Sequence, residues 1–375
     1  MAKTKRIMLV FGTRPEAIKM APLIQELKSS KSCSIHVCVT GQHRQMLDQV
    51  LELFNIRPDT DLNIMEPGQD LTGITCRVLA GMRDVIASWR PDWIVVQGDT
   101  TTTMGASLAA FYQKISVAHV EAGLRTGNIY SPWPEEINRR VAGAIALLHF
   151  PPTEQCAANL KKEGVNPDRI HVTGNTVIDA LLGTVQRIRT EQKLRKDLEQ
   201  QFSFLNPARK LILVTGHRRE SFGKGIEHLG KALRRLSERN DIELLYPVHL
   251  NPNVQEPIKR LLHDSPSVHL IDPLDYLPFV YAMDRSYLII TDSGGVQEEA
   301  PSLGKPVLVT RETTERPEGV TAGTSLLVGT DENRIVAEAE RLLDSETEYK
   351  RRSGIHNPYG DGHASERIAE ILMAS

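Results

Sequence analysis

Short runs of apolar residues recur along the chain at fairly even intervals, and segments with helical spacing separate them. Most of these runs are continuously apolar, which is typical of parallel strands that helices cover on both faces. Repeated strand–helix–strand alternation through both halves predicts two doubly wound α/β domains. The predicted strands are 6–11, 35–39, 93–97, 116–120 and 146–150 in the first half, and 211–215, 243–248, 268–271, 287–291 and 306–309 in the second.

The length of the chain, 375 residues, also favours two domains, because a single core rarely grows that large. We expect an N-terminal Rossmann-like domain over residues 1–172 and a C-terminal one over 173–363. The tail, residues 364–375, has the apolar spacing of one more helix.

Composition narrows the class of protein. Hydrophobic residues make up 40% and charged residues 25% of the chain, as in soluble globular proteins. The net charge of -2 provides no basic excess for nucleic acid, and no apolar run is long enough to span a bilayer. The apolar segment after the basic start is too short for a signal peptide, so we expect a cytoplasmic protein. Four cysteines without zinc spacing predict no metal site.

A glycine-rich segment, Thr291–Gly295, joins a predicted strand to a predicted helix. Ser293, Gly294 and Gly295 leave free backbone N–H groups at the positive end of that helix, which is a favourable place for phosphate. Glu299 follows within the first turns, where its carboxylate can reach the hydroxyls of an attached sugar. An ordinary glycine-rich turn between a strand and a helix is the alternative.

Other charged residues also follow predicted strands, and ligands of open α/β sheets bind at the carboxyl ends of the strands. Arg14 follows the first strand, where a guanidinium can bind phosphate bidentately. Lys19 lies about one turn further, and Arg316 follows the last predicted strand. A solvated surface position is the alternative for each of them.

Three carboxylates, Asp99, Glu121 and Glu135, are also close to strand ends. Carboxylates that share a partly buried site raise each other's pKa and can act as acid and base near neutral pH. His217 follows a strand and a glycine, where it can donate to a phosphate or a leaving group. A helix cap, a first-turn charge and a structural histidine remain the alternatives for these residues.

Two nucleotide-binding fingerprints are missing from the sequence. Neither G-x-G-x-x-G at a strand–helix junction nor G-x-x-x-x-G-K-[ST] occurs. Their absence argues against a hydride-transfer enzyme and against a P-loop NTPase.

Eight motifs, in order along nearly the whole chain, resemble the non-hydrolysing UDP-N-acetylglucosamine 2-epimerases. They are FGTRPEAIKMAPL (11–23), TGQHRQML (40–47), QGDTTT (97–102), HVEAGLRT (119–126), PWPEEINRR (132–140), TGNTVID (173–179), TGHRRES (215–221) and TDSGGVQEEAPSLGKPVL (291–308). The resemblance implies a glycosyltransferase-B-like fold in which two Rossmann-like domains face a cleft and the last helix crosses back to the first domain. It also implies a homodimer and no cofactor.

The resemblance further implies an activity. Such an enzyme interconverts UDP-N-acetylglucosamine and UDP-N-acetylmannosamine by eliminating UDP to give 2-acetamidoglucal and adding it back, and it feeds surface polysaccharide synthesis. The implied catalytic residues are Asp99, Glu121, Glu135 and His217, and the implied UDP-binding residues are Arg14, Lys19, Phe279, Ser293, Gly294, Gly295, Glu299 and Arg316. The implied allosteric residues, where the substrate itself activates the enzyme, are Gln42, His43, Gln45, Gln69 and His249.

Three other functions are compatible with parts of this pattern. A UDP-sugar glycosyltransferase of the same fold would share the UDP site but would need a pocket for an acceptor. A hydrolysing epimerase would release free N-acetylmannosamine and UDP. A non-catalytic nucleotide-sugar sensor would leave the three carboxylates without a role.

Overall fold

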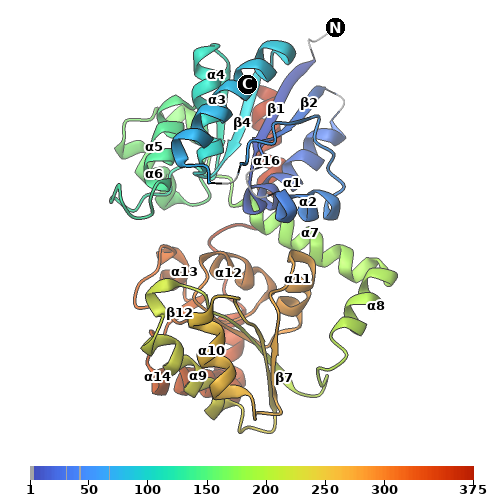
Figure 1. Ribbon diagram of the computed structural model, residues 1–375, viewed down its shortest axis with the longest axis vertical. Helices are drawn as coiled ribbons and strands as arrows, with labels where there is room; N and C mark the ends of the chain where they lie inside the picture. The colour runs from blue at the N-terminus through green and yellow to red at the C-terminus, as the bar shows by residue number, and fades with distance from the viewer. Residues whose placement is uncertain (1–3, 31, 42–43, 67) are drawn as a thin grey trace. The chain divides into compact units, whose positions relative to one another are not determined.

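The computed structural model describes residues 4–30, 32–41, 44–66 and 68–375. The chain forms two compact units (Figure 1). Unit 1 comprises residues 1–180 and 360–375, and unit 2 comprises residues 181–359. The chain passes from unit 1 to unit 2 inside helix α7 (Thr176–Thr190).

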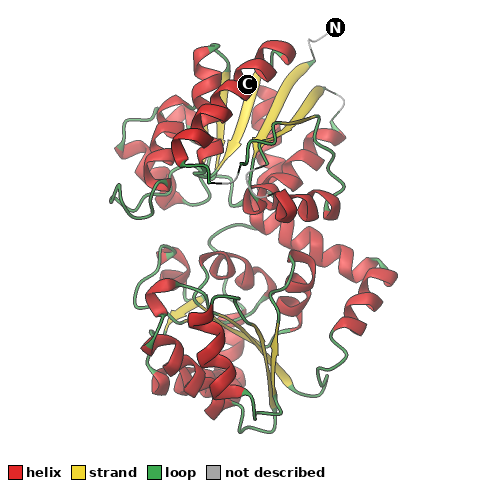
Figure 2. Ribbon diagram, viewed as in Figure 1, coloured by secondary structure: helices red, strands yellow, loops and turns green. Residues whose placement is uncertain are grey.

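Each unit is built on a six-stranded, fully parallel sheet with helices beside it (Figure 2). The order is β3-β2-β1-β4-β5-β6 in unit 1 and β12-β11-β10-β7-β8-β9 in unit 2. Read in chain order, both sheets have the 3-2-1-4-5-6 arrangement of a Rossmann fold. The predicted class, two doubly wound Rossmann-like domains, is confirmed.

The elements of unit 1 follow one another in regular alternation. Its strands are β1 (Lys5–Phe11), β2 (Cys33–Val39), β3 (Thr60–Asp61), β4 (Trp93–Gln97), β5 (Ser116–Val120) and β6 (Leu148–Phe150). Its helices are α1 (Arg14–Ser29), α2 (Arg44–Leu53), α3 (Leu71–Trp89), α4 (Thr101–Tyr112), α5 (Glu135–Ile145), α6 (Glu154–Lys162), the short 3-10 helix η1 (Pro167–Arg169), the first part of α7, and α16 (Ala364–Ala374).

Unit 2 repeats the alternation after α8 (Gln192–Gln201). Its strands are β7 (Lys210–Thr215), β8 (Ile242–Pro247), β9 (Val268–Ile271), β10 (Leu288–Thr291), β11 (Val307–Val309) and β12 (Ser325–Leu327). Its helices are η2 (Arg219–Ser221), α9 (Lys224–Leu236), α10 (Pro252–Leu262), α11 (Tyr276–Arg285), α12 (Gly294–Glu299), η3 (Ala300–Leu303), α13 (Pro317–Ala322), α14 (Glu332–Asp344) and α15 (Glu346–Ser353).

The ten strands predicted from apolar runs are all present, within a few residues at their ends. Continuous burial explains why their pattern was so clear, since every residue of β4 and of β10 is buried. The two edge strands β3 and β12 were not predicted. They have two and three residues, which is too short to produce an apolar pattern.

The last helix belongs to unit 1, although unit 2 precedes it in the chain. Helix α16 packs against α1, and Lys5 Nζ donates to the carbonyl oxygens of Leu372 and Met373 at 2.9 and 3.0 Å. At the other end of the helix, Asp179 accepts the backbone N–H groups of Ala364 and Ser365. Free N–H groups at a helix start need such a partner. Part of the TGNTVID motif therefore holds this helix in place.

None of the helices in the described ranges is both long enough and apolar enough to cross a lipid bilayer.

Candidate functional site

The carboxyl edge of the unit 1 sheet gathers the three predicted carboxylates from neighbouring segments. Asp99 lies two residues after β4, and Glu121 follows β5 directly. Glu135 is the first residue of α5, at the end of the loop that contains Pro132, Trp133 and Pro134. Parallel strands bring Asp99 and Glu121 to one edge, and Asn138 Nδ2 donates to the Asp99 carbonyl oxygen at 3.0 Å, so the first turn of α5 lies at this edge too.

Glu121 accepts hydrogen bonds from side chains of α1 and β4. Its Oε2 lies 2.5 Å from Lys19 Nζ and 2.5 Å from Gln97 Nε2. Its backbone is left-handed, with φ of 60°, which is uncommon for a residue other than glycine and is often associated with functional sites. The ion pair places Lys19 beside a candidate catalytic carboxylate.

Asp99 is oriented by α5. Its Oδ2 lies 2.5 Å from Arg139 Nη2, and its backbone carbonyl accepts from Asn138 Nδ2 at 3.0 Å. Arg139 also donates to the fully buried Glu136, which further accepts from the N–H groups of Thr126 and Gly127, from the Thr126 hydroxyl and from Arg140. Burial by itself would raise the pKa of Glu136, but those backbone donors and Arg139 together lower it. Glu136 is therefore ionised, and its hydrogen bonds connect α5 to the preceding loop.

Glu135 differs from the other two carboxylates. Its Oε2 is buried and, among the described residues, has no hydrogen-bond partner. Buried polar atoms without a partner are rare in folded proteins and often mark a functional position. The carboxylate of the adjacent Glu136, by contrast, accepts several hydrogen bonds. The two neighbouring glutamates of this motif therefore differ in how well their carboxylates are hydrogen-bonded.

Glu16 was not singled out from the sequence, and it organises the same edge. Its buried carboxylate accepts from the backbone N–H groups of Gly12 and Thr13 and from the hydroxyls of Thr100 and Thr103. Desolvation raises the pKa of Glu16, although these donors oppose the shift. Thr13 followed three residues later by a glutamate is a capping box, and this signal could have identified Glu16. Arg14, in the same turn, is only partly buried.

The carboxyl edge of the unit 2 sheet contains the predicted phosphate-binding segment. Ser293 caps the six-residue helix α12 with extended backbone, and its hydroxyl makes no capping bond within the described part of the chain. A Cβ atom added at Gly294 would lie 3.8 Å from Arg218 Nη2 and 4.0 Å from Arg316 Cζ. Two guanidinium groups therefore lie beside the start of the helix, where they favour an anion.

Three further residues predicted to bind UDP lie in the same unit. The Arg316 side chain is paired with Glu298, a buried residue that the sequence analysis did not identify. Glu299 is buried at the end of α12, and Phe279 is partly buried on α11. No signal in the sequence distinguished Glu298 from Glu299, since they are consecutive.

His217 follows β7 and lies beside Asp292, which follows β10. The distance from His217 Nδ1 to Asp292 Oδ1 is 3.1 Å. The ring of His249 is stacked on that of His217, with centroids 5.9 Å apart and an interplanar angle of 23°. A residue predicted as allosteric therefore contacts a residue predicted as catalytic.

The remaining predicted allosteric residues belong to unit 1. Gln42 and His43 lie outside the described residues, and Gln45 lies in α2. Gln69 precedes the N-cap of α3, and its Oε1 accepts the Glu66 N–H at 3.2 Å. No group of His, Cys, Asp and Glu side chains within the described ranges has the arrangement of a metal site.

Fold and site together define a two-domain α/β enzyme of the glycosyltransferase-B-like class. The family model for UDP-N-acetylglucosamine 2-epimerase matches residues 25–373, and the chain belongs to this family of isomerases. The chain is 59% identical over 370 residues to the UDP-N-acetylglucosamine 2-epimerase of Salmonella typhimurium, covering 98% of both chains. It is equally identical, over 368 residues, to the same enzyme of Escherichia coli K12. The resemblance inferred from the motifs is confirmed.

Solved structures agree with this assignment. The structure of the UDP-GlcNAc 2-epimerase from Neisseria meningitidis, bound to UDP-GlcNAc, has a TM-score of 0.90 and 51% identity, and the match covers 99% of this chain and 100% of that one. The UDP-GlcNAc 2-epimerase from Methanocaldococcus jannaschii, in complex with UDP-GlcNAc and UDP, has a TM-score of 0.80 and 32% identity. The match covers 99% of this chain and 100% of that one. A glycosyltransferase from Rickettsia africae, at 14% identity and a TM-score of 0.63, shares the fold.

Proposed function

We propose that this protein interconverts UDP-N-acetylglucosamine and UDP-N-acetylmannosamine by elimination and re-addition of UDP, and that its product feeds surface polysaccharide synthesis. The observation that carries the mechanism is the set of three carboxylates at one sheet edge, of which Glu135 retains a buried oxygen with no hydrogen-bond partner among the described residues. In the first step a base removes the C2 proton. The C–H electron pair forms the C1=C2 double bond, and the C1–O pair leaves with UDP.

The second step reverses the first with the opposite stereochemistry. UDP adds back to C1, and a proton is delivered to the other face of C2. Because removal and delivery occur on opposite faces, more than one acid–base group is useful, and several carboxylates meet this need. We propose that Glu135 carries one of these proton transfers. Asp99, oriented by Arg139, and Glu121, held by Lys19 and Gln97, supply the other transfer and stabilise developing positive charge.

We further propose that His217 and the start of α12 bind the diphosphate that leaves. Arg218 and Arg316 beside Gly294 supply positive charge, and Ser293 supplies a hydroxyl, since its backbone N–H already donates to Thr291 Oγ1 at 2.9 Å. We assign Arg14, Lys19, Phe279, Gly295 and Glu299 to UDP binding as the family resemblance implies. The N. meningitidis relative bound to UDP-GlcNAc supports the choice of nucleotide sugar.

The experiment that tests this function incubates the isolated protein with UDP-N-acetylglucosamine in heavy water, without any acceptor. NMR then follows the conversion of the nucleotide sugar. We expect UDP-N-acetylmannosamine to appear with deuterium at C2, because the abstracted proton exchanges with solvent. Product without solvent deuterium would contradict the elimination route. Free N-acetylmannosamine with UDP would indicate a hydrolysing enzyme, and no conversion until an acceptor is added would indicate a glycosyltransferase.

A second nucleotide-sugar site is also part of the proposal, made of Gln42, His43, Gln45, Gln69 and His249. The contact between His249 and His217 supports it, because a ligand on His249 would act directly on the stacked ring. The M. jannaschii relative, solved with UDP-GlcNAc and UDP together, gives further support.

The UDP assignment predicts the effect of two single substitutions. Arg14→Ala removes a phosphate cation and Glu299→Ala removes an acceptor for sugar hydroxyls. Each lost charged hydrogen bond costs about 1.5–3 kcal/mol, which weakens UDP binding roughly ten- to a hundredfold. Isothermal calorimetry measures this effect, with the exposed Arg57→Ala and Glu340→Ala as matched controls. If both test variants bound UDP with wild-type affinity, the assignment of Arg14 and Glu299 to the UDP site would be wrong.

We also propose that the protein is a homodimer that uses an apolar groove between α3 and α4. The groove is lined by Cys76, Leu79, Ala80, Arg83, Ala109, Tyr112 and Gln113. Tyr112, which lines the groove, and the neighbouring Phe111 are 68% and 59% exposed, so large aromatic surface lies in the groove and at its edge.

Ala80→Glu is expected to convert the dimer to a monomer, because it places a charge in this apolar groove. Sedimentation velocity across a concentration series measures the change. The control is Ala158→Glu, the same substitution at an exposed position of α6 in the same unit. A dimer in both variants would place the interface elsewhere.

A further inference from the structure

Asp292 is a buried carboxylate that the proposed mechanism does not use. It is only 1% exposed and directly follows β10. Its Oδ2 accepts the backbone N–H groups of His217 and Arg218, each at 2.8 Å. One oxygen therefore fixes the turn that presents His217.

The other oxygen of Asp292 has a different position. Among the described residues Oδ1 is buried without an aligned hydrogen bond, and His217 Nδ1 lies 3.1 Å away. At this distance a small rotation of the imidazole about its Cβ–Cγ bond would align the N–H with the carboxylate. Hydrogen bonds of catalytic groups are often poorly aligned until ligand binds.

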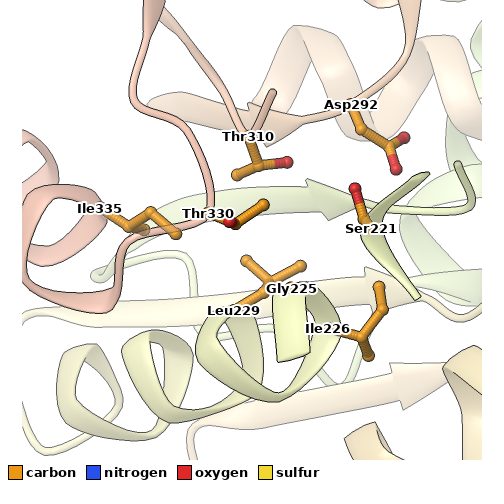
Figure 3. A pocket seen from close by; sticks show the side chains of 8 residues that line it. All are labelled: Ser221, Gly225, Ile226, Leu229, Asp292, Thr310, Thr330 and Ile335. Atoms are coloured by element: carbon orange, nitrogen blue, oxygen red, sulfur yellow. The ribbon is translucent and has the colours of Figure 1, made fainter. Parts of the chain in front are cut away.

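None of the described residues that line the small pocket beside Asp292 carries a positive charge. Asp292 lines a small pocket with the hydroxyl-bearing side chains of Ser221, Thr310 and Thr330, and the other lining residues are Gly225, Ile226, Leu229 and Ile335 (Figure 3). Burial and the nearby Asp292 raise the pKa of Tyr246 well above its ordinary value, so that phenol stays neutral. Its hydroxyl lies 3.4 Å from the Gly216 carbonyl oxygen.

The charge state of Asp292 is set by its partners. Burial by itself would raise its pKa, but the His217 side chain and the two backbone N–H donors outweigh burial and lower it. The carboxylate is therefore ionised at neutral pH and is an acceptor only. His249, by contrast, uses its own Nδ1 to accept the Asn251 N–H at 3.1 Å.

We infer that Asp292 is a positioning residue for His217: it holds the Nδ1–H tautomer and leaves Nε2 as the atom that serves the departing diphosphate. This inference rests on the proposed function only for the role of Nε2. A buried carboxylate that orients a catalytic imidazole in this way controls which ring nitrogen is available for proton transfer. The ring of His249 lies on one side of His217, roughly parallel to it, with the centroids 5.9 Å apart.

Asp292→Asn separates the two functions of the carboxylate. The amide oxygen of asparagine can replace Oδ2 and keep both backbone N–H bonds, so the turn is preserved. The amide NH₂ then faces His217 Nδ1 and favours the opposite tautomer, with the hydrogen on Nε2. We expect the turnover number to fall about 10²- to 10⁴-fold, with UDP affinity within about threefold of wild type.

Two measurements distinguish positioning from simple structural support. In the first, ¹⁵N NMR of labelled histidines should show His217 with the hydrogen on Nδ1 in the wild type and on Nε2 in Asp292→Asn. In the second, Asp292→Asn should have little further effect in a His217→Ala background. Thr310→Val, a change of similar size in the same pocket, should leave the tautomer and the rate unchanged.

Several results would overturn the inference. An unchanged tautomer in Asp292→Asn would do so, as would an equal loss of rate with and without His217. If the wild-type protein does not epimerise UDP-N-acetylglucosamine at all, the proposed function fails. The tautomer measurement, which needs no turnover, would still decide the pairing of Asp292 with His217.

Discussion

Glu135→Gln is expected to lower the turnover number for epimerisation about 10²- to 10⁴-fold, because glutamine cannot accept or deliver the C2 proton. Asp99→Asn and Glu121→Gln should produce losses in the same range. Glutamine is nearly isosteric with glutamate, so the fold and the affinity for UDP should be retained. Initial rates by a coupled assay or by NMR, together with calorimetry for UDP, measure both quantities.

The three variants should differ in more than rate. At least one should release free UDP and 2-acetamidoglucal, because re-addition then lags behind elimination. The matched control is Glu154→Gln, which changes an exposed glutamate at the first position of α6, as Glu135 is at the first position of α5. If all three variants had near-normal rates and deuterium still entered C2, the base would have to be a residue other than these three.

Gly123→Ala is expected to destabilise unit 1 severely. Gly123 has φ of +89°, and a Cβ atom added there would lie 2.3 Å from the carbonyl oxygen of Cys156. Left-handed backbone costs an alanine about 1–2 kcal/mol, and overpacking against backbone adds about 1–3 kcal/mol or more. We therefore expect a loss of roughly 2–5 kcal/mol in the free energy of unfolding.

The protein contains its own probe for this experiment. All three tryptophans, Trp89, Trp93 and Trp133, lie in unit 1, so their fluorescence in a denaturant titration reports the unfolding of that unit. Gly127→Ala is the control, since its φ is +79° and a Cβ atom there would meet no described atom within 4 Å. Equal destabilisation by the two substitutions would show that backbone strain, and not the contact with Cys156, dominates.

Much of this architecture was determined by the sequence alone. Ten strands were recognisable because strands covered on both faces are continuous apolar runs, as Trp93–Gln97 and Leu288–Thr291 show. Asp99, Glu121 and His217 were recognisable as candidates because the carboxyl ends of parallel strands share an edge. Motif order along the chain was sufficient to identify the family.

The partners of those candidates were decided only by the tertiary structure. Asp99 contacts Arg139, which is 40 residues away in the sequence, and Asp292 accepts the backbone N–H of His217, which is 75 residues away. These contacts form because crossover connections bring distant strand ends together. Glu135 and Glu136 are adjacent in sequence, yet Glu135 retains a buried oxygen that no described residue contacts by a hydrogen bond, whereas Glu136 accepts several donors. A local pattern predicts that a carboxylate stands at a strand end or a helix start, whereas its hydrogen bonds depend on segments folded against it from elsewhere in the chain.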